Sequence, residues 1–131
     1  RRYCSSCKDA YTAKNEEIQE LLEEYCTATP LKPAEVLQRW QKTYANAAGE
    51  FVLYNAVGCS QCGGTGYKGR VGLYEFLEAT LPIKKMIQHQ ATVEELQSAA
   101  IMQGMRTLKQ AGIELVLQGQ ANIFQIRAVC N

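Results

Sequence analysis

Cysteine side chains are the groups in this 131-residue chain whose spacing points most directly to chemistry. Four of the six cysteines form two Cys-x-x-Cys pairs in opposite halves of the sequence, Cys4 with Cys7 and Cys59 with Cys62. Two such pairs can each place two sulfur ligands on one side of a tetrahedral zinc ion, at Zn–S distances of about 2.3 Å. We therefore predict one structural zinc site with these four ligands and no open coordination position for water or substrate.

The same thiols allow two other uses at the level of sequence. A disulfide framework is typical of shorter secreted chains with denser crosslinks. A thiol–disulfide enzyme needs a cysteine pair exposed at a helix N-terminus, where the thiol pKa is lowered, whereas Cys59 and Cys62 lead directly into glycines. Cys26 and Cys130 stand apart from both pairs, and Cys26 is expected to fill space in the core.

A zinc ion held by four thiolates carries a formal charge of about −2, which backbone N–H groups and nearby cations must offset. Gly63 and Gly64 follow the second pair, and we expect them to free the backbone to turn its amides toward sulfur. The cations close to the cysteines in sequence are candidates to offset the remaining charge, with ordinary solvated surface as the alternative: Arg2, Lys8, Lys68 and Arg70.

The composition argues against several classes of function. Lys and Arg together number 14 against 13 Asp and Glu, so no net charge draws the chain toward nucleic acid or anionic lipid. No stretch approaches the roughly 18 consecutive apolar residues of a membrane span, and the first residues lack the apolar centre of a signal peptide. We expect a cytoplasmic chain with no nucleic-acid partner and no direct insertion into the membrane.

A helical pair is expected between the two cysteine pairs, over residues 11–49. Asn15 is a candidate N-cap, Pro30 interrupts the first helix, and Pro33 suits the first turn of the second. Each helix carries an apolar stripe at helical spacing: Ile18, Leu21, Leu22, Tyr25 and Cys26 in the first, and Val36, Leu37, Trp40 and Tyr44 in the second. The simplest arrangement is two helices that face each other.

A short apolar stretch, residues 51–57, predicts a strand, with residues 70–77 as its expected partner. The glycine-rich segment between them, residues 58–69, suits a tight loop. A phosphate-binding loop is a poor alternative for these glycines, because they do not lead into a helix that begins with Lys-Ser or Lys-Thr.

The sequence changes after Leu77 to a run of short helices. Thr80 and Pro82 open one, and Thr92 with Glu95 forms a capping box for the next. Gly104 is expected to close the second of these helices, and Leu108, Leu115 and Val116 mark a third. Gly112 is expected to interrupt the third helix and Gly119 to follow it. Asn122 is expected to cap a last helical segment. The predicted fold is therefore α+β, with a zinc-pinned sheet and its helical insert in residues 1–78 and a helical bundle in residues 79–131.

Several other residues have both a functional and a structural interpretation. Trp40 and Tyr44 are expected to pack between the insert helices, although aromatic pairs also form docking sites for other proteins. Arg70 and Glu75 are expected to support the local strand and loop, with contacts between subunits as the alternative. His89 is the only histidine in the sequence. It is not expected to bind the metal ion, because four thiols already complete a tetrahedral set of ligands.

A longer pattern resembles a known family. Residues 4–7 read CSSC and residues 58–75 read GCSQCGGTGYKGRVGLYE. Both resemble the C-terminal region of type II secretion and type IV pilus assembly ATPases, because a Gly-Tyr-x-Gly-Arg-x-Gly-x-Tyr-Glu run directly follows the cysteines. Residues 104–108, which read GMRTL, are similar to the helical end of the same proteins.

The resemblance implies a parent protein that works as a hexameric ATPase at the cytoplasmic face of the inner membrane. Such a protein uses ATP and magnesium to move a membrane platform that assembles a pilus or pseudopilus. For this chain it implies a non-catalytic, structural and interaction role, with neighbouring subunits and inner-membrane platform proteins as partners. The sequence has no Gly-x-x-x-x-Gly-Lys-Ser/Thr phosphate loop, so we expect a C-terminal fragment that does not hydrolyse ATP alone.

The chain departs from the family pattern at Ala111, where Asp is common, in residues 121–125, and in a longer segment between the cysteine pairs. Residues 59–66 also match the Cys-x-x-Cys-x-Gly-x-Gly unit of Hsp40 chaperones, which repeat that unit several times, whereas it occurs here once. An Hsp40-like client-binding module and a thiol–disulfide protein are the alternative functions.

Overall fold

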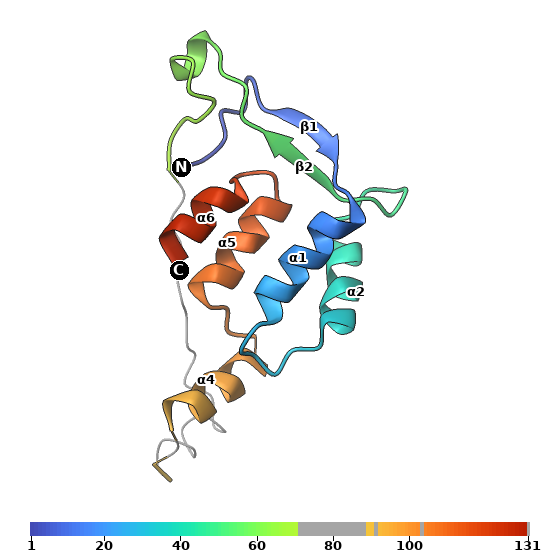
Figure 1. Cartoon of the computed structure of the whole chain (residues 1–131), viewed down its shortest axis with the longest axis vertical. Helices are drawn as coiled ribbons and strands as arrows, with labels where there is room; N and C mark the ends of the chain where they lie inside the picture. The colour runs from blue at the N-terminus through green and yellow to red at the C-terminus, as the bar shows by residue number, and fades with distance from the viewer. Residues whose placement is uncertain (71–88, 91, 103, 131) are drawn as a thin grey trace.

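The computed structural model describes residues 1–70, 89–90, 92–102 and 104–130. This part of the chain combines five α-helices with one two-stranded sheet (Figure 1), so the predicted α+β class is confirmed. None of the helices in the described ranges is long and apolar enough to cross a membrane.

The sheet pairs β1, Asp9–Thr12, with β2, Val52–Asn55, in antiparallel register from Asp9 opposite Asn55 to Thr12 opposite Val52. A strand is present within the predicted range 51–57, but its partner in the structure is β1. Part of β1 falls in the range 11–49 that was predicted to be the helical insert. Residues 71–77 of the expected partner lie outside the described residues.

The helical insert contains α1, Asn15–Cys26, and α2, Pro33–Thr43. Helix α1 begins one position earlier than predicted, because Lys14 rather than Asn15 occupies the cap. The backbone N–H of Lys14 donates to Glu17 Oε1 at 3.2 Å. The predicted apolar stripe of α1 is buried, and Pro33 stands in the first turn of α2 as expected.

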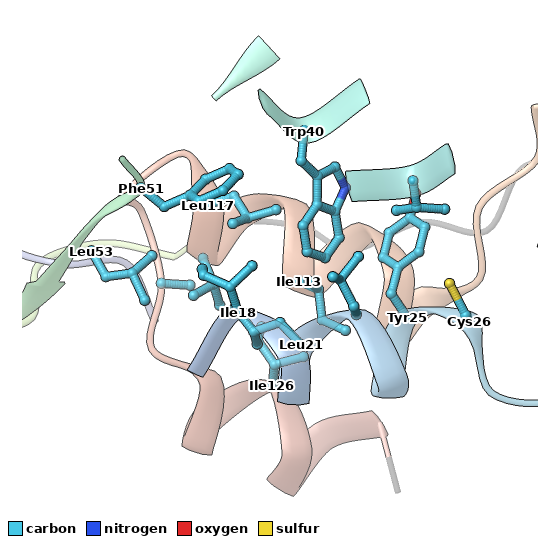
Figure 2. Packing of buried hydrophobic residues seen from close by; sticks show 14 residues of the cluster. Ile18, Leu21, Tyr25, Cys26, Trp40, Phe51, Leu53, Ile113, Leu117 and Ile126 are labelled. Carbon is cyan, nitrogen blue, oxygen red and sulfur yellow. The ribbon is translucent and has the colours of Figure 1, made fainter. Parts of the chain in front are cut away.

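Trp40 connects the two insert helices. Its side chain is 3% exposed, and its ring meets the ring of Tyr25 edge-on, with the centroids 5.3 Å apart. Figure 2 shows Trp40 reaching from α2 toward α1. The packing interpretation of Trp40 is thus confirmed.

Three helices follow in the second half of the chain: α4, Val93–Met102; α5, Leu108–Leu117; and α6, Ile123–Cys130. Their predicted caps are present, since Thr92 Oγ1 accepts from Glu95 N at 3.1 Å and Asn122 Oδ1 accepts from Phe124 N at 2.7 Å. The helix expected to open at Thr80 and Pro82 lies outside the described residues.

Gly112 does not interrupt a helix, contrary to the prediction. It lies inside α5 and is buried against α6, where a Cβ atom would come 2.4 Å from Ile126 Cγ2. The helix tolerates the poor intrinsic propensity of glycine because the missing side chain lets α6 pack closely. This glycine is therefore a packing residue.

A single hydrophobic cluster joins the insert to the C-terminal helices. Helix α5 contacts α1, α6 and β2, and Ile113 at its centre is fully buried. The cluster contains Ile18, Leu21, Leu22, Tyr25, Cys26, Val36, Trp40, Phe51, Leu53, Ile113, Val116, Leu117, Ala121 and Ile126 (Figure 2). Side chains from both predicted parts, 1–78 and 79–131, thus share one core, and Cys26 fills space in it as expected.

Candidate metal centre

The two cysteine pairs meet at the end of the sheet that lies farthest from α4 (Figure 1). Cys4 and Cys7 stand in a turn just before β1. After β2, Cys59 caps the short 3-10 helix η1, Ser60–Cys62, and Cys62 is its last residue. Because β1 and β2 are antiparallel, the start of one strand lies beside the end of the other. The sheet therefore brings the pairs together.

The four sulfur atoms lie within 4.8 Å of one another. Three of their separations are 3.8 Å: Cys4 to Cys59, Cys7 to Cys62, and Cys59 to Cys62. A tetrahedron of sulfurs at about 2.3 Å from a central ion has edges of about 3.8 Å, whereas a disulfide joins its sulfurs at about 2.05 Å. The four cysteines can therefore hold a metal ion, and their spacing suits a tetrahedral one.

Backbone N–H groups point at two of the sulfurs. Gly58 N donates to Cys7 Sγ at 3.3 Å, while Cys59 N and Gly66 N donate to Cys62 Sγ at 3.3 and 3.2 Å. These donors stabilise thiolate, the form that binds metal. Backbone donors to sulfur were predicted near Gly63 and Gly64, whereas the glycine donors in the structure are Gly58 and Gly66.

Gly63 and Gly64 shape the loop in another way. Gly64 N donates to the carbonyl of Cys59 at 2.8 Å, and Gly63 takes the left-handed conformation, with φ +68°, that ends η1. The glycine amides that face sulfur belong to Gly58 and Gly66. A Cβ atom at Gly58 would lie 2.5 Å from Gly64 O, and one at Gly66 would lie 2.7 Å from Ala56 Cβ.

Backbone donors and desolvation shift the pKa values of Cys4, Cys7 and Cys62. The N–H groups of Cys59 and Gly66 lower the pKa of Cys62 to about 6, with that of Cys59 contributing most. A backbone hydrogen bond from Ser6 lowers the pKa of Cys4, whereas desolvation raises the pKa of Cys7 to about 12. The thiols thus differ in how readily each loses its proton.

The N-terminal segment is also tied to the loop by its backbone. Cys4 N donates to Gly66 O at 2.9 Å, and Tyr3 stacks on Tyr67 with the ring centroids 5.6 Å apart. Gly66 therefore contacts both pairs, through its N–H to Cys62 and its carbonyl to Cys4. The two halves of the site are held in register independently of the sulfurs.

Lys8, one of the candidates to offset the charge of the cysteine site, makes two contacts with other parts of the chain. Lys8 Nζ donates to the carbonyl of Gly119 at 2.8 Å and lies 4.1 Å from the centroid of the Tyr54 ring. Lys8 therefore connects the cysteine end to the turn between α5 and α6. Arg2 and Lys68 line a neighbouring hollow, and Arg70 is exposed.

Comparison with known proteins decides the family. The family described as "Type II/IV secretion system protein" matches residues 1–128. The chain belongs to this family. The resemblance noted for the cysteine pattern and the GMRTL segment is thereby confirmed.

Curated relatives in the secretion and pilus systems match this family member along much of its length. The type IV pilus assembly ATPase TfpB of Acinetobacter baylyi is 30% identical over 129 residues, which are 98% of this chain and 19% of that protein. The type IV pilus assembly ATPase PilB of Thermus thermophilus is 33% identical over 105 residues, 80% of this chain and 12% of that protein. The type II secretion system protein E of Pectobacterium carotovorum is 38% identical over 69 residues, 52% of this chain and 14% of that protein. The chain thus spans about a fifth or less of these relatives.

The other candidate residues of this secretion-family chain lie apart from the cysteines. Tyr44 Oη donates to Glu114 Oε1 at 3.4 Å, which joins the insert to α5. His89 lies on an exposed turn and does not belong to the cysteine cluster. Glu75 lies outside the described residues.

One connection near Tyr44 was not predicted. Arg106 of the GMRTL segment pairs with Glu114 through Nε and Oε2 at 2.5 Å. Arg106 and Glu114 are eight positions apart along the chain, on a loop and a helix, so no helical spacing rule links them. The family motif itself was the only signal that could have pointed to Arg106.

Proposed function

We propose that the chain is the non-catalytic, zinc-binding C-terminal region of a type II secretion or type IV pilus assembly ATPase. The observation that carries the zinc assignment is the sulfur geometry, three separations of 3.8 Å in a cluster of four cysteines. Cys4, Cys7, Cys59 and Cys62 are the proposed ligands. Family membership supports the proposed parent machine.

The proposed role of the metal is structural. Four protein ligands complete a tetrahedral zinc shell, so the site offers no position to water or substrate. Bound zinc would join the turn before β1 to the loop after β2, at the base of the helical insert. Zinc binding would then add its free energy to folding by closing this large loop.

The parent protein is proposed to be an ATPase that powers secretion or pilus assembly. The sequence contains no phosphate loop, so this chain alone is proposed not to hydrolyse ATP, while the parent protein binds ATP and magnesium. We place the parent in a hexamer at the cytoplasmic face of the inner membrane, with neighbouring subunits and platform proteins as partners. The names of the relatives, pilus assembly ATPases and type II secretion proteins, support this assignment. The division into parts 1–78 and 79–131 also remains a proposal.

The first test is elemental analysis of the purified chain, together with thermal unfolding before and after a strong chelator. We expect one zinc per chain and a lower unfolding temperature after chelation, because the metal binds the folded state only. A metal-free, folded chain with its cysteines joined in disulfides would contradict the zinc site. A free thiol that exchanges with a disulfide probe in the metal-loaded chain would favour the thiol–disulfide alternative instead.

A further inference from the structure

A hollow of about 660 Å³ lies beside the cysteine cluster and takes no part in the proposed zinc site. Its charged lining residues are all cations, namely Arg2, Lys8 and Lys68. Ser5, between the first two cysteines, and the backbone of Gly69 complete one side of it. A volume of this size falls within the range of small-molecule sites, roughly 300–1,000 Å³.

Three backbone carbonyl groups around the hollow already accept hydrogen bonds from the protein. Gly69 O accepts from Arg2 N at 3.1 Å, Gly119 O accepts from Lys8 Nζ at 2.8 Å, and Gln120 O accepts from Tyr3 N at 2.8 Å. The guanidinium of Arg2, the ammonium of Lys68 and the remaining N–H groups of Lys8 are donors. The chemistry that this lining offers to a ligand is therefore hydrogen-bond donation with positive charge.

These cations are not balanced by carboxylates within the described ranges. The ion pairs there use Arg106, Lys109 and Arg127, and no carboxylate in those ranges lies within 4.0 Å of the cations of the hollow. Five of the 13 acidic residues lie on α1: Glu16, Glu17, Glu20, Glu23 and Glu24. A chain with a net charge of only +1 thus concentrates positive charge at one place.

We propose that this hollow binds the diphosphate group of a small soluble ligand. The planar guanidinium of Arg2 matches two phosphate oxygens, and the two lysines add point charges that suit a second phosphate. The hollow has room for more than one phosphate group, which favours a diphosphate over a single carboxylate or phosphate. This inference uses residues other than the proposed zinc ligands and goes beyond the proposed function.

The test is a titration of the ¹⁵N-labelled 131-residue chain with inorganic pyrophosphate, followed by NMR. We expect one site per chain, with shifts at the amides of Ser5, Lys68, Gly69 and Gly119. The double variant Arg2→Gln/Lys68→Gln should bind about tenfold more weakly or worse, because charge-assisted hydrogen bonds are lost. Both side chains are exposed, so the variant should fold.

The matched control is Arg39→Gln/Lys42→Gln, which removes the same charge from exposed positions of α2 and should bind pyrophosphate like the unaltered chain. Equal weakening in both variants would overturn the proposal, because it would show a response to net charge alone. So would amide shifts that only follow release of metal into solution, measured in the same samples. Binding to phosphatidylglycerol vesicles without any response to pyrophosphate would also overturn it, by assigning the cations to a lipid surface.

Discussion

At the scale of single residues, the cysteine cluster depends on a position that bears no sulfur. Gly66 donates its N–H to Cys62 Sγ and accepts the N–H of Cys4, while its Cα sits against Ala56 with no room for a Cβ. The backbone N–H groups of Cys59 and Gly66 lower the pKa of Cys62. The chain thus prepares its sulfurs for a cation through main-chain geometry as well as through ligand spacing.

The assignment of the cysteines leads to a residue-level prediction. Cys59→Ser should abolish zinc binding and lower the unfolding temperature, because one ligand is removed from a four-ligand site. Cys26→Ser is the control, since Cys26 is buried between the helices and lies outside the sulfur cluster. Elemental analysis of both variants decides the matter. Normal zinc content in Cys59→Ser would refute the proposed ligand set.

At the scale of elements, the helices were predictable and β1 was not. Helical periodicity depends on neighbours three and four positions apart, so the stripe of α1 could be read directly from the sequence. Strand β1 reads Asp-Ala-Tyr-Thr, with no apolar alternation, and three of its four residues are exposed. Its paired residues in β2 lie at least 40 positions further along the chain. The residues around β1 contain no pattern that predicts its pairing with β2.

In the cysteine site, too, some features could be predicted from the sequence and others could not. The ligand spacing predicted which sulfurs meet, because two Cys-x-x-Cys pairs have few other uses. The donors Gly58 and Gly66 could not be picked from among the glycines of the loop, since their amides reach sulfur only through the particular turns that η1 imposes. The hollow formed by Arg2, Lys8 and Lys68 depends on the fold and was likewise not predictable.

Packing between α5 and α6 gives a prediction at this scale. Gly112→Ala should destabilise the fold by about 1–3 kcal/mol, because the new Cβ overlaps Ile126 Cγ2 in a filled core. Helix propensity alone would predict the opposite sign, a gain of about 1 kcal/mol. Chemical denaturation measures the difference.

The variant Gly112→Ala/Ile126→Val is the internal control for that experiment. It removes the Cδ1 atom of Ile126, which would lie 3.0 Å from the new Cβ, and keeps Cγ2. The cost of Gly112→Ala should therefore be somewhat smaller when it is measured relative to Ile126→Val. A more stable Gly112→Ala protein would show that α6 does not pack on α5 in this way.

At the scale of the whole molecule, one core serves both halves of the chain while the cysteine cluster stands at one end. Tyr25 illustrates the core: it is 6% exposed, packs on Trp40, and its backbone carbonyl accepts from Gln110 Nε2 at 3.0 Å. Residues from α1, α2 and α5 thus meet at one point. Global stability therefore depends on all of these segments together.

Alkaline pH should weaken this shared core. Burial, followed by the charge of Glu114, raises the pKa of Tyr25 to about 12, above the value near 10 of an exposed tyrosine. Folding favours the neutral phenol of Tyr25. Its contribution to the free energy of unfolding is therefore complete below about pH 10 and is lost as the pH rises toward 12. We expect a loss of up to about 3 kcal/mol from this group.

Denaturation at a series of alkaline pH values tests the prediction. Tyr25→Phe cannot ionise at this position, so its stability should fall less steeply between about pH 10 and 12 than that of the unaltered chain. Parallel pH dependence in the two proteins would assign alkaline unfolding to other groups.

The contact between Lys8 and Gly119 also has a consequence for the order of assembly during synthesis. The two residues are 111 positions apart, and Tyr3 likewise bonds to Gln120. A chain leaving the ribosome can bring its four cysteines together once residue 62 has emerged. The ammonium of Lys8 and the backbone N–H of Tyr3 reach their acceptors, Gly119 and Gln120, only after the turn that follows α5 exists. The cysteine end can therefore form early, and its attachment to the helical core is among the last steps of folding.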